Sequence, residues 1–336
     1  MKLSIIRAAI VLLAGVLTIS AAPVSAKNLT LCGASPGGLW SLLGAGLDAA
    51  AKADDKNTTI TYQTSSGGYA NVLQVKRKKC DLGIIHVGEG VQAKNGGAPF
   101  KSPVKGFSVL TVMYDWAPMQ WIVTKEFSDK HGIKTLADIA TKKPAMRLIL
   151  NRRGILPSQL GELTLKASGV TLKDITSWGG KIEFQASGNA SEIMQNRRAD
   201  LWANAVFIGS GKIRRVAKSV PVTLLSVPDK AIQAAVKTFG ARPWTIKAGA
   251  YPWLKRDIKT HAARAVLIVD DSMSENDAYK LTKAILENVA KVQGVHKAMK
   301  GFTPQLMASL EELPYHPGAK KAYKEAGVAQ KGPSQK

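Results

Sequence analysis

The chain has 336 residues and a strong excess of positive charge, with 47 Lys and Arg against 24 Asp and Glu. The length suggests about two domains, and an apolar fraction of 45% excludes a disordered chain. The cationic residues are dispersed and not interleaved with aromatic residues, so we expect a solvated surface that attracts small anions and no nucleic-acid site.

Residues 1–26 have the pattern of a cleaved export signal. Lys2 and Arg7 give a positive start, the segment from Ala8 to Ser20 is almost wholly apolar, and small residues precede a cleavage site near Ala26. A membrane anchor is disfavoured because a span needs about 20 apolar residues. We therefore expect a periplasmic mature protein that is not itself membrane-spanning.

The sequence then alternates between strand and helix patterns, which predicts α/β layers. In the first part we expect strands at 28–33, 58–63 and 81–85 and helices at 39–52 and 69–79. Strand–loop–helix units in this order predict a doubly wound half.

A second run of α/β elements begins after Trp116. We expect strands at 119–124, 146–150, 201–207, 222–226 and 265–269 and helices at 135–139, 158–168, 191–198, 274–292 and from 317. The segment 242–259 has no clear period and is expected to be an ordered loop. The expected lobes are residues 27–116, then 117–260, with 261–336 returning to the first lobe.

Two cysteines follow the export signal, Cys32 and Cys80. They are expected at opposite ends of the first and third strands of a parallel sheet, so we favour two buried free thiols, although an oxidising compartment permits a disulfide. The five His residues are scattered, and no Cys or His pair has ligand spacing. We therefore expect no metal and no other cofactor.

The breaks after the first two strands are the most informative loops, Ser35-Pro36-Gly37-Gly38 and Ser65-Ser66-Gly67-Gly68. Each leads into a helix, and ligands of open α/β sheets bind beyond the carboxyl ends of the strands. Glycine lets the backbone approach a ligand, and a helix N-terminus presents free N–H groups. The pair is expected to hold a carboxylate, with Asn71 adding an amide. As generic turns, either loop would need no function.

Motifs for nucleotide binding and catalysis are missing from the sequence. It contains neither G-x-x-x-x-G-K-[ST] nor G-x-G-x-x-G, and no H-E-x-x-H. A binding protein fits this inventory better than an enzyme.

The mature chain resembles the TAXI-type solute receptors of TRAP transporters over nearly its whole length. The matching pieces are Gly33-Ala34-Ser35-Pro36-Gly37-Gly38, Gln63-Thr64-Ser65-Ser66-Gly67-Gly68 with Asn71, Cys80-Asp81-Leu82-Gly83-Ile84-Ile85, Ala199-Asp200-Leu201-Trp202-Ala203, Ala248-Gly249-Ala250-Tyr251-Pro252, and Tyr279-Lys280-Leu281-Thr282-Lys283-Ala284-Ile285 with Glu287-Asn288. Each piece is short, but their order and spacing are specific.

The resemblance implies a two-lobed periplasmic binding protein of the type II kind, each lobe a doubly wound sheet flanked by helices. It implies a hinge, a ligand enclosed between the lobes, a monomer, and delivery to sodium-coupled TRAP membrane subunits without catalysis. Ligands of such receptors are small carboxylates, including C4-dicarboxylates and acidic amino acids. The resemblance implies that backbone N–H groups and hydroxyl groups bind the ligand carboxylate, and that the site does not rely on a single essential arginine.

Three loops depart from the pattern of these receptors. The first continues as Leu39-Trp40-Ser41 where Thr and Tyr are usual, and the second has Gly68 where Ser is usual. The third reads Asn151-Arg152-Arg153-Gly154-Ile155-Leu156-Pro157. These changes favour a less polar or larger organic acid, with Arg152 or Arg153 pairing its carboxylate. The alternative places both arginines in solvent.

The candidate ligand-binding residues are Ser35, Gly37, Gly38, Trp40, Ser65, Ser66, Gly67, Gly68, Asn71, Asn151, Arg152, Arg153, Gly154 and Asn204. Two other functions stay open on sequence alone. A periplasmic sensing module that feeds a signalling receptor would have the same cleft. An exported enzyme acting on anionic substrates would need a base and a nucleophile within reach, which no constellation suggests.

Overall fold

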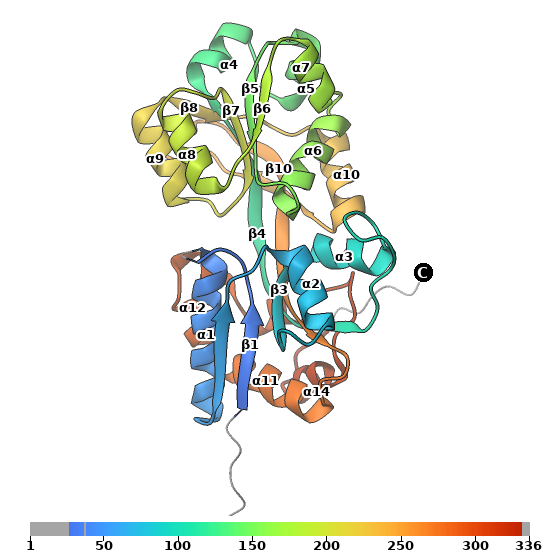
Figure 1. Cartoon of the computed structure of the whole chain (residues 1–336). Coiled ribbons are helices and arrows are strands. Elements are labelled where there is room, and N and C mark those ends of the chain that lie inside the picture. Colours follow the sequence, from blue (N-terminus) through green and yellow to red (C-terminus); the bar gives the residue numbers. More distant parts are fainter. Residues whose placement is uncertain (1–26, 37, 331–336) are drawn as a thin grey trace, which may run out of the picture.

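The computed structural model describes residues 27–36 and 38–330. The expected export signal and Gly37 lie outside these residues. Figure 1 shows two lobes joined by two long strands, β4 (Phe107–Thr124) and β10 (Ile258–Asp270). The expected α/β fold with two lobes is confirmed.

Lobe 1 is the part drawn below the crossing in Figure 1, and its sheet has the order β2-β1-β3-β10-β4. Its other strands are β1 (Lys27–Cys32), β2 (Thr58–Gln63) and β3 (Leu82–His86). Its helices are α1 (Leu39–Asp54), α2 (Gly68–Lys76), α3 (Val87–Asn95), α11 (Glu275–Glu287), α12 (Val289–Gln293), α13 (Pro304–Met307), α14 (Pro317–Glu325) and the 3-10 turn η1 (Lys297–Gly301). β1 is parallel to β2 and β3, whereas β10 is antiparallel to β3 and β4.

Lobe 2 continues the same sheet as β4-β7-β5-β6. Its strands are β5 (Arg147–Leu150), β6 (Lys181–Phe184), β7 (Leu201–Ala205), β8 (Val222–Leu224) and β9 (Arg242–Ile246). Its helices are α4 (Lys125–His131), α5 (Leu136–Lys142), α6 (Leu156–Ala167), α7 (Leu172–Ser177), α8 (Ser187–Gln195), α9 (Gly211–Ser219) and α10 (Asp229–Phe239). β5, β6 and β7 run parallel, and β4 pairs antiparallel with β7.

The two long strands cross between the lobes side by side. β4 pairs with β10 as far as Pro118, opposite Ala262, and pairs with β7 from Met119 onward. β10 pairs with β9 up to Ala262 and with β3 from Ala265. One backbone ladder thus runs through both lobes, and the chain crosses between them at these residues.

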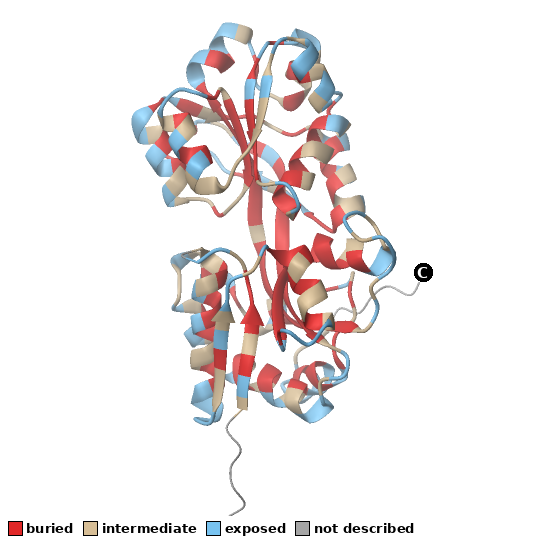
Figure 2. Cartoon of the chain, in the orientation of Figure 1, coloured by how far each residue is buried: buried red, intermediate tan, exposed pale blue. Residues whose placement is uncertain are grey.

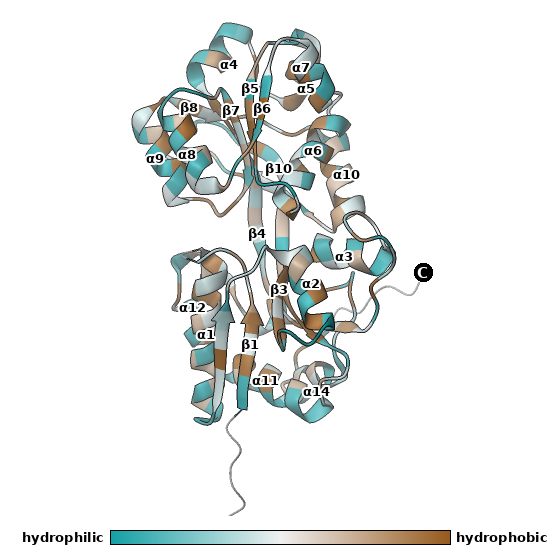
Figure 3. Ribbon diagram, in the orientation of Figure 1, coloured by the Kyte–Doolittle hydropathy of each residue, from teal (hydrophilic) through white to brown (hydrophobic). Residues whose placement is uncertain are grey.

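Burial explains why the central strands read as apolar runs in the sequence. Almost every residue of β4 and β10 is buried, because helices or neighbouring strands cover both faces (Figures 2 and 3). Lobe 1 has one large apolar core, and lobe 2 has one core on each face of its sheet. Leu156 and Phe239 of lobe 2 pack into the lobe 1 core, so the lobes touch along α3, α6 and α10.

The strands expected at 119–124 and 265–269 are parts of the longer β4 and β10, and two further expected elements differ in kind from the structure. The segment 242–259 is not a loop throughout, since β9 pairs with the start of β10. β9 escapes detection because it is an exposed strand that contains Pro243 and buries only Ile246. The helix expected at 274–292 is two helices, which meet at Asn288, where φ is −119°.

The expectation of free thiols is wrong, because Cys32 and Cys80 form a disulfide with their Cα atoms 5.8 Å apart. The error lies in the stagger of the two strands. Cys32, the last residue of β1, is level with Gly83, which is near the start of β3. The end of one strand therefore lies beside the beginning of the next, within disulfide reach.

Candidate functional site

A cavity of about 410 Å³ lies between the lobes, next to the crossing strands. Lobe 1 lines it mainly with residues after β1, β2 and β3, and lobe 2 with residues after β5, β6 and β7. The carboxyl ends of parallel strands from both lobes thus face one space, which is where α/β sheets bind ligands. The volume is in the range of small-molecule sites.

Eight of the predicted residues line this cavity. They are Ser35, Gly38, Trp40, Gly67 and Gly68 from lobe 1 and Asn151, Arg152 and Asn204 from lobe 2. Ser65, Ser66, Asn71, Arg153 and Gly154 are not among the lining residues, and Gly37 lies outside the described part of the chain.

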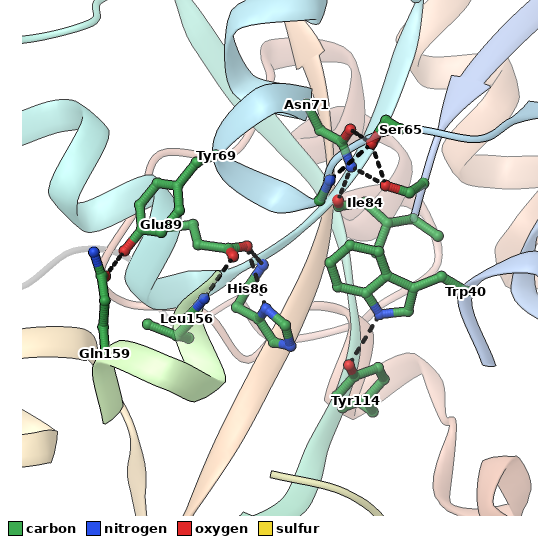
Figure 4. A network of polar contacts seen from close by, with 12 residues as sticks. Trp40, Ser65, Tyr69, Asn71, Ile84, His86, Glu89, Tyr114, Leu156 and Gln159 are labelled. Carbon is green, nitrogen blue, oxygen red and sulfur yellow. Dashed lines mark hydrogen bonds and ion pairs between the residues drawn. The ribbon is translucent and has the colours of Figure 1, made fainter. Parts of the chain in front are cut away.

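Ser65 and Asn71 make their bonds within lobe 1. Asn71 is fully buried, and its Nδ2 donates to the carbonyls of Gly33 and Ile84, each at 2.7 Å. Ser65 Oγ lies 2.6 Å from the Gly33 carbonyl and 2.5 Å from Asn71 Oδ1, as Figure 4 shows. These bonds fix the loop after β2 to the ends of β1 and β3, so both side chains shape the loop.

The two adjacent arginines have different surroundings. Arg152 is half-buried and lines the cavity, and its backbone N–H donates to Asn151 Oδ1 at 2.8 Å. Arg153 is exposed, and its guanidinium stacks on the ring of Phe184, 3.6 Å from the ring centre. Of the pair, Arg152 is therefore the one placed to meet a ligand.

A polar cluster lines the cavity together with Arg152 on the lobe 2 side. Asn151 Nδ2 donates to Asn204 Oδ1 at 2.7 Å, and Asn204 Nδ2 donates to Ser187 Oγ at 3.0 Å. Lys212, at the start of α9, also lines the cavity. This side combines two cationic side chains with amide and hydroxyl groups, which is suited to an anion.

Aromatic side chains form another wall of the cavity. Trp40 Nε1 donates to Tyr114 Oη at 3.0 Å, and the Trp40 and His86 rings lie 5.0 Å apart. Phe207 packs edge-on against Tyr114, also at 5.0 Å. Burial raises the pKa of Tyr114, so its hydroxyl stays neutral and serves as a hydrogen-bonding group. This wall can cover the apolar part of a ligand.

Among the lining residues that the sequence did not predict, Glu89 has the largest effect on the site. It is fully buried, and its Oε2 accepts the backbone N–H of His86 at 2.7 Å and lies 3.2 Å from His86 Nδ1. Its Oε1 accepts the N–H of Leu156, in lobe 2, at 3.2 Å (Figure 4). A second bond between the lobes joins Tyr69 Oη to Gln159 Oε1. Glu at the third position of a helix is a capping-box signal, which could have located it.

The other missed lining residues include His86, Tyr114, Ser187, Phe207 and Lys212. They follow or lie within strands whose positions were predicted, but only the tertiary fold brings them together. Among the described residues no group of three or more His, Cys, Asp and Glu side chains could hold a metal ion. In the same residues, every helix is too short or too polar to cross a bilayer.

Two α/β lobes on paired crossing strands, with a cavity at their junction, are an arrangement that solved periplasmic binding proteins share. The chain belongs to the NMT1-like family, whose model matches residues 31–327. The fold is one that solved periplasmic binding proteins also have.

Solved structures of similar fold share little sequence with this chain. MatC from Rhodopseudomonas palustris with bound malate is 13% identical, with a TM-score of 0.54 over 91% of this chain and 97% of that one. The periplasmic binding protein BugD is 15% identical, with a TM-score of 0.52 over 90% and 98%. PhnD1 from Prochlorococcus marinus in complex with methylphosphonate is 14% identical, with a TM-score of 0.53 over 80% and 89%. At such identities the likeness is one of fold.

Proposed function

We propose that the protein is the extracytoplasmic receptor of a TAXI-type TRAP transporter, and that it delivers a small organic acid to the membrane subunits. The observation that carries this proposal is the position of Arg152 and Lys212, which line the cavity between the lobes beside Asn151, Ser187 and Asn204. The sequence pieces shared with TAXI-type receptors support the choice of transporter.

Capture by closure is the mechanism that this geometry supports. The carboxylate of the solute pairs with Arg152 through charge-assisted hydrogen bonds, and the aromatic wall of Trp40, Tyr114 and Phe207 covers the rest. Hydrogen-bond donors from both lobes can reach the bound solute at the same time only when the lobes are closed. The solute shifts the open–closed equilibrium by its difference in affinity for the two states. The closed form is the one that the membrane subunits recognise.

A screen of organic acids on the purified protein tests capture. An acid that binds only the folded state raises the melting temperature, and the same acid should reduce the radius of gyration in small-angle scattering. The proposal is contradicted if no acid in the screen raises the melting temperature, or if saturation causes no compaction.

Delivery is tested separately, with the membrane subunits reconstituted in vesicles. Uptake of the bound acid should require both the receptor and a sodium gradient. Uptake that is unchanged without the receptor would remove the transporter part of the proposal and leave solute binding intact.

A further inference from the structure

The site at which the second glycine loop was expected to hold a ligand carboxylate already contains a carboxylate of the chain itself. A Cβ on Gly68, the first residue of α2, would lie 1.6 Å from Glu89 Oε2. Glu89 therefore lies against the start of α2, within the first turn of α3, and in a hydrogen bond to the first residue of α6. Helix N-termini attract anions.

We propose that Glu89 acts as a built-in anion at this end of the cavity, and that the site therefore selects acids with one carboxylate and an apolar body. The inference rests on the proposed function and narrows its ligand class. Glu89 is thus a specificity-determining residue, which disfavours dicarboxylates.

The first argument is that nearby donors are already used. The backbone N–H groups of His86 and Leu156 donate to Glu89, and the Nδ1 of His86 lies within hydrogen-bond distance of it. A second carboxylate of a ligand would find these groups engaged. An unpaired polar group in a closed cavity costs free energy, so the site would reject that ligand.

The second argument is electrostatic. A carboxylate placed beside Glu89 would meet a like charge in a space from which closure excludes water, where such juxtaposition is strongly unfavourable. Specificity through a repulsive group is an established way to reject a near-identical ligand.

The third argument is that the lobe 2 lining remains suited to one anion. Arg152 and Lys212 both line the cavity, and Trp40, Tyr114 and Phe207 add aromatic surface to the same cavity. A monocarboxylate with an aliphatic or aromatic body would place its charge at Arg152 and its apolar end toward His86 and Glu89.

Calorimetry with matched pairs of acids tests the inference. The pairs are butyrate and succinate, hexanoate and adipate, and phenylacetate and 1,4-phenylenediacetate. In every pair that binds, we expect the monoacid to bind the wild type at least tenfold more tightly. Glu89→Gln removes the charge and keeps the shape, so it should reduce this preference at least tenfold by strengthening diacid binding.

The matched control is Glu192→Gln, an identical change at an exposed position of α8 that does not line the cavity. It should keep the wild-type preference. If Glu89→Gln does not fold, the wild-type ratios decide alone. Diacids that bind as tightly as their monoacid partners would overturn the inference and leave the proposed function standing. Failure of every acid to bind would overturn both.

Discussion

Gly68 and Glu89 are in such close contact that the Glu89 side chain leaves no room for a Cβ at position 68. A Cβ at position 68 would lie 1.6 Å from Glu89 Oε2. The Glu89 carboxylate is held there by hydrogen bonds from the backbone N–H groups of His86 and Leu156. The glycine at the position where similar receptors usually have serine therefore has a structural partner, the buried carboxylate.

Gly68→Ala should displace the Glu89 carboxylate from its hydrogen bonds. The expected loss in the free energy of unfolding is about 2–3 kcal/mol, the value of hydrogen bonds to a buried charged group. Urea denaturation measures it. Gly188→Ala is the control, because Gly188 also lines the cavity in the first turn of a helix and a Cβ there meets nothing within 4 Å. Equal stability of the two variants would contradict the contact.

Arg152→Ala should weaken binding of the solute by about 2–5 kcal/mol, because the carboxylate would be left without its charged partner in a closed cavity. Arg153→Ala removes the same charge from the neighbouring position, where the guanidinium stacks on Phe184 outside the cavity. Calorimetry should give near wild-type affinity for this second variant. Wild-type affinity in both would exclude pairing with Arg152.

The disulfide between Cys32 and Cys80 should stabilise the fold by restricting the unfolded chain. With 48 residues of separation, loop-closure entropy predicts a loss of about 4 kcal/mol when the bond is removed. Cys32→Ala with Cys80→Ala tests this by guanidinium denaturation. Reductant should lower the midpoint for the wild type and leave the double variant unchanged. A wild type insensitive to reductant would disagree with this expectation.

The buried side chain of His261 should make the free energy of unfolding depend on pH. Its side chain is fully buried on β10, with Nε2 2.9 Å from Thr164 Oγ1, and burial lowers its pKa from 6.5 to about 4. The unfolded chain binds a proton at His261 more readily than the folded chain does. The stability that neutral His261 contributes is therefore complete above pH 6.5 and is lost as the pH falls toward 4. The loss amounts to about 3 kcal/mol.

Denaturation of His261→Gln across the same pH range provides the check. The glutamine side chain can still bond to Thr164, so the variant should fold while its unfolding free energy falls less steeply between pH 6.5 and 4. Parallel pH profiles for the two proteins would assign the acid sensitivity to other groups.

The sequence was sufficient to predict the α/β layers because buried parallel strands read as apolar runs. The strands around Leu82–Ile85 and Ala265–Val269 are examples, and both are covered on two faces. β9 was missed because an exposed strand with a proline has no such signal. The thiol prediction failed because strand stagger, which set the distance between Cys32 and Cys80, is not encoded in local pattern.

Prediction of the cavity was partial for a similar reason. Glycine loops after strands can be located from local sequence, and Gly38, Gly67 and Gly68 do line the cavity. The place of Glu89 in the cavity depends on its contact with Leu156, 67 positions away in the sequence. Only the packing of α3 against lobe 2 creates that contact. Ser65 and Asn71 look like ligand donors in the sequence, but their bonding partners within lobe 1 emerge only from the fold.

Since the chain enters lobe 2 along β4 and leaves it along β10, the first and last elements, β1 and α14, both belong to lobe 1, the lower half of Figure 1. A surface tether or fusion at either element would immobilise that half and leave the other free to turn. A fluorophore on the exposed face of α9 would then report the proposed closure of lobe 2, which would make the molecule a starting point for a single-chain optical sensor.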